Sequence, residues 1–168
     1  ARALDWACAQ SGRELTVSEI EKVKARFNFY YGENLCNISR LYPNVKETLE
    51  NLKEKGYTLA VVTNKPTRHV QPVLSAFSID HLFSEMLGGQ SLPAIKPHPG
   101  PLYYLCGKFG VEPRQILFVG DSKNDILAAH AAGCPAVGLT YGYNYNMPIS
   151  DSNPDWVFDD FSQLLTIL

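Results

Sequence analysis

The chain has 168 residues, of which 45% are hydrophobic and 19% are charged, and its formal net charge is −2. This composition suits one globular domain, or a domain with a small appendage, and excludes wholesale disorder. A charge so close to neutral argues against partners bound by bulk electrostatics, so we expect no nucleic-acid and no membrane partner. No apolar run is long enough to span a bilayer, and residues 1–10 lack the pattern of a signal peptide.

The four cysteines lie far apart, and no two of them form a Cys-x-x-Cys pair. They are Cys8, Cys36, Cys106 and Cys134. This spacing favours reduced thiols, buried as small apolar residues, over metal ligands or disulfides. Reduced thiols in turn predict a cytoplasmic protein.

Residues 1–38 have a helical pattern and contain no predicted strand. The first residues have the pattern of a helix interior without an N-cap, which indicates a piece of a longer protein. A capping-type sequence at residues 16–19 predicts the start of a second helix, which we expect to end at Gly32.

Beyond residue 40 the pattern alternates between helices and strands. Predicted helices span residues 44–55, 68–77, 99–109, 124–132 and 161–168. Predicted strands span residues 57–62, 83–87, 116–119, 136–139 and 156–158. This alternation, with short Gly/Pro turns, predicts an α/β fold with a Rossmann-like parallel sheet covered by helices on both faces. We therefore divide the chain into a small helical part, 1–40, and an α/β part, 41–168.

The first candidate site follows the strand at residues 57–62. Thr63 ends this strand, and Asn64 continues into a tight turn before Pro66. A hydroxyl followed by backbone N–H groups in such a turn is suited to bind phosphoryl oxygens. The alternative is that Thr63 only caps the next helix.

The second candidate is Lys96, which lies in a proline-rich loop directly before Pro97. A lysine held next to a proline can neutralise the charge of an attacked phosphate as a point cation. The alternative is an ordinary solvated surface lysine. His98, alone in the same loop, suits a structural or incidental role better than that of a general base.

The third candidate follows the strand at 116–119, where Gly120 precedes Asp121 and a second carboxylate, Asp125, lies four residues further on. Carboxylate oxygens suit a hard divalent cation such as Mg²⁺, and open α/β sheets bind ligands at this end of their strands. The alternative is that Asp121 is a helix N-cap and that Asp125 only favours the N-terminus of the helix through its dipole.

In this order, the three candidate sites resemble the motifs of the haloacid dehalogenase superfamily of phosphohydrolases. Thr63 matches the second motif of that superfamily, Lys96 the third, and residues 120–125 the fourth. The resemblance covers nearly all of residues 41–168. Three stretches are similar to bacterial phosphoglycolate phosphatases, and they span residues 62–67, 96–102 and 138–145.

The resemblance implies a Mg²⁺-dependent phosphomonoester hydrolase whose substrate is a small phosphorylated acid, 2-phosphoglycolate. Asp121 would be a metal ligand, and Asp125 would support the metal site or orient Lys96. Thr63 and the N–H of Asn64 would bind the phosphoryl group, and Lys96 would neutralise its charge. Residues 1–40 would be part of an α-helical cap, and 41–168 a Rossmann-like core without its first strand.

The sequence departs from the superfamily in one respect: it contains no Asp-x-Asp pair. In the superfamily this pair supplies the nucleophile, which forms an aspartyl-phosphate, and the general acid/base. We therefore expect the nucleophile upstream of Ala1, on a strand beside 57–62 or 116–119, and we expect the 168 residues alone to be inactive. The alternatives are a phosphosugar phosphatase or β-phosphoglucomutase-like enzyme, and a non-catalytic binding module. Nothing in the sequence indicates an oligomeric state.

Overall fold

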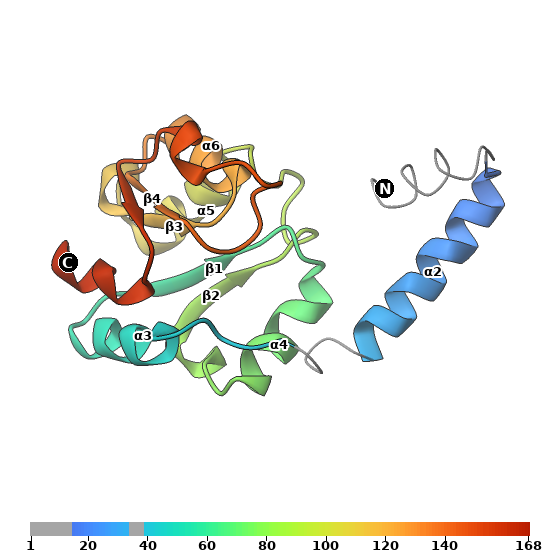
Figure 1. The fold of residues 1–168 in the computed structure, drawn as a ribbon, viewed down its shortest axis with the longest axis horizontal. Helices are drawn as coiled ribbons and strands as arrows, with labels where there is room; N and C mark the ends of the chain where they lie inside the picture. Colours follow the sequence, from blue (N-terminus) through green and yellow to red (C-terminus); the bar gives the residue numbers. More distant parts are fainter. Residues whose placement is uncertain (1–14, 34–38) are drawn as a thin grey trace. The chain divides into compact units, whose positions relative to one another are not determined.

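The computed structural model describes residues 15 to 33 and 39 to 168, and the chain divides into two compact units, Ala1–Ser39 and Arg40–Leu168. The described part of the first unit is helix α2, Val17–Glu33 (Figure 1). Its start is the predicted one, because Thr16 N–H donates to Glu19 Oε2 (2.9 Å) and Glu19 N–H donates to Thr16 Oγ1 (3.3 Å). The predicted end at Gly32 was wrong, since the helix continues through Glu33, the last residue described before 39. The first predicted helix lies outside the described residues.

The second unit alternates helices and strands as predicted. Its elements are α3 (Val45–Glu54), β1 (Leu59–Val62), α4 (Val70–Ala76), β2 (Phe83–Leu87), α5 (Gly100–Phe109), β3 (Phe118–Gly120), α6 (Lys123–Ala132), β4 (Ala136–Leu139) and β5 (Trp156–Phe158). Every predicted strand is present, although β1 and β3 each begin two residues late. The last predicted helix, 161–168, is a 3₁₀ helix over Phe161–Thr166. No described helix is both long enough and apolar enough to cross a membrane.

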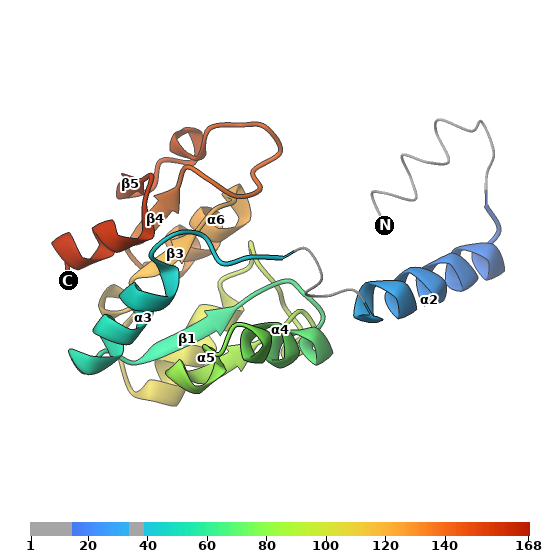
Figure 2. The ribbon, with the colours of Figure 1, turned by 60° about the horizontal axis from the view of Figure 1, so that its bottom comes forward.

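All strand pairs in the described residues are parallel, and they form two sheets (Figures 1 and 2). Strands β1 and β2 form one sheet, and the second has the order β3-β4-β5. Within residues 39 to 168, no strand pairs with the remaining edge of β1 or of β3. These are the two strands beside which the sequence predicted a further strand.

Helices cover both faces of the β3-β4-β5 sheet. Successive residues of a strand point to opposite faces, and in β4 they pack against different helices. Ala136 lies in a cluster with Leu102 of α5 and Ile126 of α6. Val137 and Leu164, the latter from the terminal 3₁₀ helix, lie in a separate cluster. All five side chains are almost completely buried. This layered arrangement is the predicted Rossmann-like α/β fold.

The two cysteines in the described residues, Cys106 and Cys134, are free thiols. Burial raises the pKa of both, and for Cys134, with Cys106 as a second cause, it raises the pKa to about 11. Both are therefore uncharged near neutral pH, which agrees with the predicted role of small apolar residues. Cys8 and Cys36 lie outside the described residues.

Candidate active site

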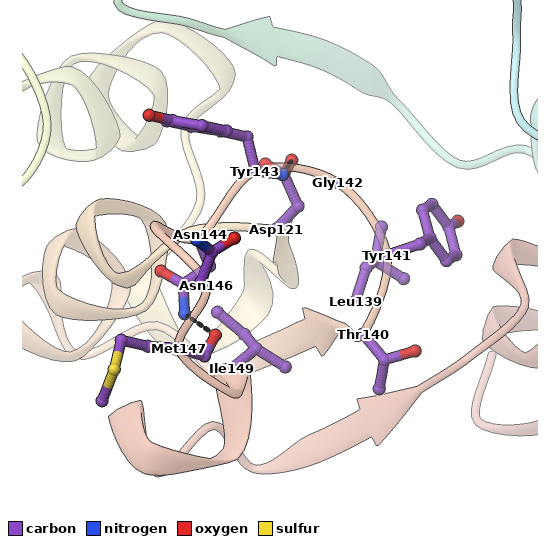
Figure 3. Close-up of a pocket in the computed structure, with 10 residues that line it drawn as sticks. All are labelled: Asp121, Leu139, Thr140, Tyr141, Gly142, Tyr143, Asn144, Asn146, Met147 and Ile149. Atoms are coloured by element: carbon purple, nitrogen blue, oxygen red, sulfur yellow. Dashed lines mark hydrogen bonds between the residues drawn. The ribbon is translucent and has the colours of Figure 1, made fainter.

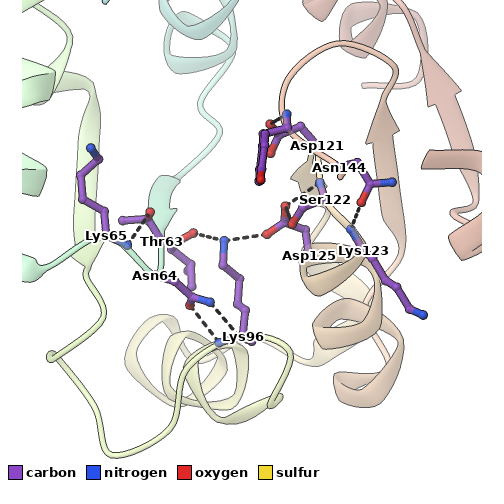
Figure 4. A network of polar contacts seen from close by, with 11 residues as sticks. Thr63, Asn64, Lys65, Lys96, Asp121, Ser122, Lys123, Asp125 and Asn144 are labelled. Atoms are coloured by element: carbon purple, nitrogen blue, oxygen red, sulfur yellow. Dashed lines mark hydrogen bonds and ion pairs between the residues drawn. The ribbon is translucent and has the colours of Figure 1, made fainter. Parts of the chain in front are cut away.

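The five candidate residues lie around one cleft of about 300 Å³ (Figure 4). Thr63 and Asn64 follow β1, Lys96 lies in the loop between β2 and α5, and Asp121 and Asp125 follow β3. Parallel strands place their carboxyl ends at the same side of a sheet, and this explains why residues so distant in sequence meet. Other residues that line the cleft are Lys65, Ser122, Asn124, Tyr143 and Tyr145.

Lys96 is a largely buried, paired cation and not a solvated surface lysine. Its Nζ lies 2.7 Å from Asp125 Oδ1 and donates a hydrogen bond to the carbonyl oxygen of Val62 (2.6 Å). The side chains of Lys96 and Asp125 are only 11% and 6% exposed. An ammonium group has three N–H donors, so these two contacts leave one for a ligand in the cleft. The lysine also joins the end of β1 to the start of α6.

Asp125 uses both of its carboxylate oxygens within the protein. Oδ1 pairs with Lys96, and Oδ2 accepts hydrogen bonds from the N–H (3.0 Å) and the Oγ–H (2.8 Å) of Ser122. Ser122, and not Asp121, is therefore the N-cap of α6. A Cβ on Gly120 would lie 2.3 Å from Cβ of Asp125, so only glycine allows this packing. Of the two roles considered for Asp125, this geometry favours orienting Lys96.

Asp121 has one carboxylate oxygen available. Its Oδ2 accepts a hydrogen bond from the backbone N–H of Tyr143 (2.8 Å), whereas Oδ1 has no hydrogen-bond partner in the described part of the chain. A partly exposed carboxylate oxygen suits Mg²⁺, which is commonly bound by one or two carboxylates together with water and substrate phosphate. The described residues contain no cluster of three or more His, Cys, Asp or Glu that could hold a metal alone. The free oxygen of Asp121 therefore fits an Mg²⁺ ion that is also held by water and substrate phosphate.

The turn after β1 is held from two sides. Lys65 N–H donates to Thr63 Oγ1 (3.1 Å), and Gly89 N–H donates to the carbonyl oxygen of Lys65 (2.7 Å). The hydroxyl of Thr63 thus stabilises its own turn and does not cap a helix. The backbone N–H of Asn64 has no acceptor among the described residues, although Asn64 lines the cleft. The turn therefore offers this N–H and the Thr63 hydroxyl proton to an anion.

Comparison with known proteins identifies the family. The profile of the haloacid dehalogenase-like hydrolases matches residues 4–139. The chain belongs to this family. It is 84% identical over 168 residues to the phosphoglycolate phosphatase of Haemophilus influenzae (strain 86-028NP) and 78% identical over 167 residues to that of Mannheimia succiniciproducens. The alignments cover 100% and 99% of the chain and 75% of each relative.

Solved structures agree with this assignment. The crystal structure of a predicted phosphoglycolate phosphatase from Haemophilus somnus 129PT matches with a TM-score of 0.97 at 75% identity, covering 99% of this chain and 74% of that one. A putative β-phosphoglucomutase from Thermotoga maritima matches with a TM-score of 0.69 at 22% identity, covering 92% of this chain and 70% of that one, and this likeness is evidence for the fold alone. The predicted superfamily and fold class are thus confirmed.

The loop between β4 and the segment at Ile149 holds Asp121 in place in this hydrolase (Figure 3). Besides the hydrogen bond from Tyr143, the loop is fastened by Asn144, whose Oδ1 accepts the N–H of Lys123 (2.8 Å) and whose Nδ2 donates to the carbonyl oxygen of Met147 (2.9 Å). Sequence reasoning noted residues 138–145 only for their resemblance and missed this role. The role depends on a backbone N–H, which does not require a particular residue type at position 143. Only Gly142 beside it could have indicated the contact from the sequence.

Replacing Gly142 with Ala should weaken Mg²⁺ binding and turnover together in this hydrolase. Gly142 has φ +107°, and an added Cβ would lie 2.1 Å from Asp121 Oδ2, so the loop or the carboxylate must move. Displacement of a metal-site support costs about 10- to 100-fold in affinity or activity. Turnover measured over a range of Mg²⁺ concentrations gives both quantities.

The matched control for this substitution is Gly107→Ala in helix α5. A Cβ at Gly107 meets nothing within 4 Å, and its φ is not positive. This variant should keep the wild-type Mg²⁺ dependence and gain about 0.5–1 kcal/mol in free energy of unfolding. If Gly142→Ala behaves like Gly107→Ala, the loop does not support Asp121.

The side chains of His98 and Tyr141 do not line the cleft around Lys96. His98 Nδ1 accepts the N–H of Gly100 (3.0 Å) at the start of α5, which bears out the predicted structural role. The hydroxyl of Tyr141 is buried without a hydrogen-bond partner in the described residues. Burial, followed by the charge of Asp160, raises the pKa of Tyr141 to about 12. This phenol therefore stays protonated near neutral pH and cannot serve as a base.

Proposed function

We propose that the protein hydrolyses a small phosphorylated acid, 2-phosphoglycolate, in a Mg²⁺-dependent reaction. The observation that carries the proposal is the ammonium group of Lys96, fixed between the Val62 carbonyl and Asp125 in a cleft that also contains Thr63 and Asp121. This set of groups suits phosphoryl transfer. The substrate is supported by the high identity to relatives named phosphoglycolate phosphatase.

Two side chains and one backbone N–H would bind and neutralise the transferring phosphoryl group. The Thr63 hydroxyl and the Asn64 N–H would donate to phosphoryl oxygens from the end of β1, and Lys96 would donate its third N–H. Fixed donors stabilise the charge that develops in the transition state more than mobile donors do. Each of these groups is already positioned by the contacts described above.

Asp121 would hold the Mg²⁺ ion through Oδ1. Lys96 neutralises Asp125, so Lys96, Asp121 and Asp125 together carry a net charge of one carboxylate. This negative charge attracts a divalent cation. When bound, Mg²⁺ supplies positive charge that offsets the negative charge on the phosphate oxygens. Asp125 would support the metal site by keeping Lys96 in place.

The attack on phosphorus requires a carboxylate nucleophile if an aspartyl-phosphate forms. Asp125 is paired with Lys96, and Asp121 is assigned to the metal. The sequence contains no Asp-x-Asp pair. We therefore assign the nucleophile to none of the 168 residues, and the chemical roles proposed here are those of binding and charge neutralisation.

The assay that tests this proposal uses the protein expressed from its natural gene. It measures the inorganic phosphate released from 2-phosphoglycolate, with Mg²⁺ and with EDTA. We expect Mg²⁺-dependent release, and a kcat/KM for 2-phosphoglycolate at least ~10-fold above that for β-glucose 1-phosphate, since a wrong substrate leaves polar groups of the site unpaired. Conversion of β-glucose 1-phosphate to glucose 6-phosphate would support a mutase instead. Absence of Mg²⁺-dependent phosphate release would refute a phosphatase.

A further inference from the structure

We propose that the side chain of Asn64 is a positioning residue that fixes the backbone of Lys96, an inference that rests on the proposed function. Asn64 Nδ2 donates to the carbonyl oxygen of Lys96 (2.8 Å), and the N–H of Lys96 donates to Asn64 Oδ1 (3.1 Å) (Figure 4). One carboxamide thereby joins the turn after β1 to a loop 32 residues further along the chain.

Within the described residues, the backbone of Lys96 makes only these two hydrogen bonds. Neither its N–H nor its carbonyl has a backbone partner there. At the other end of the side chain, Nζ contacts the Val62 carbonyl and Asp125. Lysine has a flexible four-carbon stem with about 2 kcal/mol of rotamer entropy, so contacts at both ends are needed to fix its ammonium group. Asn64 supplies one of these two anchors.

The chemistry of asparagine explains why this residue suits the position. A carboxamide presents one acceptor and two donors in a plane, which matches the adjacent N–H and C=O groups of a single residue. Alanine provides neither group, and aspartate lacks the donor. Residue 64 then has two separate functions: its backbone N–H binds the phosphoryl group, and its side chain holds Lys96. Substituting the side chain removes only the second.

A double-mutant cycle on kcat tests whether Asn64 acts through Lys96. Asn64→Ala should lower kcat by about tenfold and leave the Mg²⁺ dissociation constant unchanged, whereas in a Lys96→Met background it should cause no further loss. The cycle is measured with 2-phosphoglycolate and with p-nitrophenyl phosphate, a simple phosphomonoester. An equal loss of kcat from Asn64→Ala in both backgrounds would overturn the inference.

Asn124→Ala is the matched control for the cycle. Asn124 lines the same cleft, and its carboxamide has no hydrogen-bond partner in the structure as described. Its replacement should therefore change kcat by the same factor with and without Lys96. Non-additivity for Asn64 together with additivity for Asn124 supports a specific connection between Asn64 and Lys96.

A second measurement needs no substrate and so separates this inference from the proposed function. Amide hydrogen exchange followed by NMR should show the Lys96 N–H exchanging at least ~10-fold faster in Asn64→Ala than in wild type, because its acceptor is lost. The His98 N–H, which donates to the Ile95 carbonyl (2.9 Å), serves as the internal reference and should be unchanged. A protein without phosphatase activity would refute the proposed function alone. An unchanged Lys96 exchange rate would refute the role of Asn64.

Discussion

Replacing Asp121 with Asn should weaken Mg²⁺ binding by roughly 100-fold and reduce turnover with it. Two unit charges 4 Å apart interact with about 4 kcal/mol at an effective dielectric constant of 20, and 1.4 kcal/mol corresponds to a factor of ten. Screening that leaves about 2.8 kcal/mol of this energy still corresponds to a loss of roughly 100-fold in affinity. The substitution keeps the shape of the side chain, and an amide oxygen can still accept the hydrogen bond from Tyr143 N–H.

The control for this prediction is Asp125→Asn, because the sequence alone offered both carboxylates as metal ligands. Both oxygens of Asp125 already have protein partners, whereas Oδ1 of Asp121 does not. Mg²⁺ titration by calorimetry, without substrate, should therefore show a clearly smaller rise of the dissociation constant for Asp125→Asn than for Asp121→Asn, because the first leaves the Lys96 charge unpaired but removes no ligand. Equal weakening by the two substitutions would mean that Asp125 is also a ligand, and an unchanged constant for Asp121→Asn would exclude Asp121.

The positions of the site residues could be predicted from the sequence because strand order carries this information. Thr63, Lys96 and Asp121 each follow a recognisable strand, and parallel strands end at one side of a sheet. Local sequence spacing, however, says nothing about which carboxylate is free. The fold distinguishes Asp121 from Asp125 by placing Lys96 beside Asp125 and a backbone N–H beside Asp121.

The contacts that support the site were less predictable, for the same physical reason. The hydrogen bond from Tyr143 to Asp121 uses a backbone N–H, which every residue except proline has, so residue type gives no indication of it. The side chain of Asn64 was not expected to contact Lys96, because the pairing depends on how two loops approach one another. Near the C-terminus, an apolar pattern over 161–168 predicted a helix but could not distinguish α from 3₁₀ in so short a segment. That residues 1–40 form part of a cap stays a prediction.

Replacing Lys96 with Met should lower kcat by about 10²- to 10³-fold, the usual cost of removing one donor that stabilises transition-state charge. Methionine keeps much of the apolar stem and removes only the ammonium group. The Mg²⁺ dissociation constant should change much less than in Asp121→Asn, because Lys96 is not a ligand. Single-turnover rates, together with calorimetric Mg²⁺ titration, separate the two effects. A variant that keeps wild-type kcat would exclude Lys96 from the chemical step.

The same substitution should also lower the free energy of unfolding by about 3 kcal/mol, because breaking a buried ion pair leaves one charge without its partner. Asp125 is 4% exposed, so water cannot replace the lost ammonium group. Adding Asp125→Asn removes the unpaired charge and keeps an acceptor for Ser122, so Lys96→Met/Asp125→Asn should recover most of the lost stability. Turnover should not recover, since the ammonium group is still absent. Urea unfolding and kcat, measured on the two variants, test both statements. If the double variant is no more stable than Lys96→Met, the lost stability came from packing of the lysine stem and not from the buried charge.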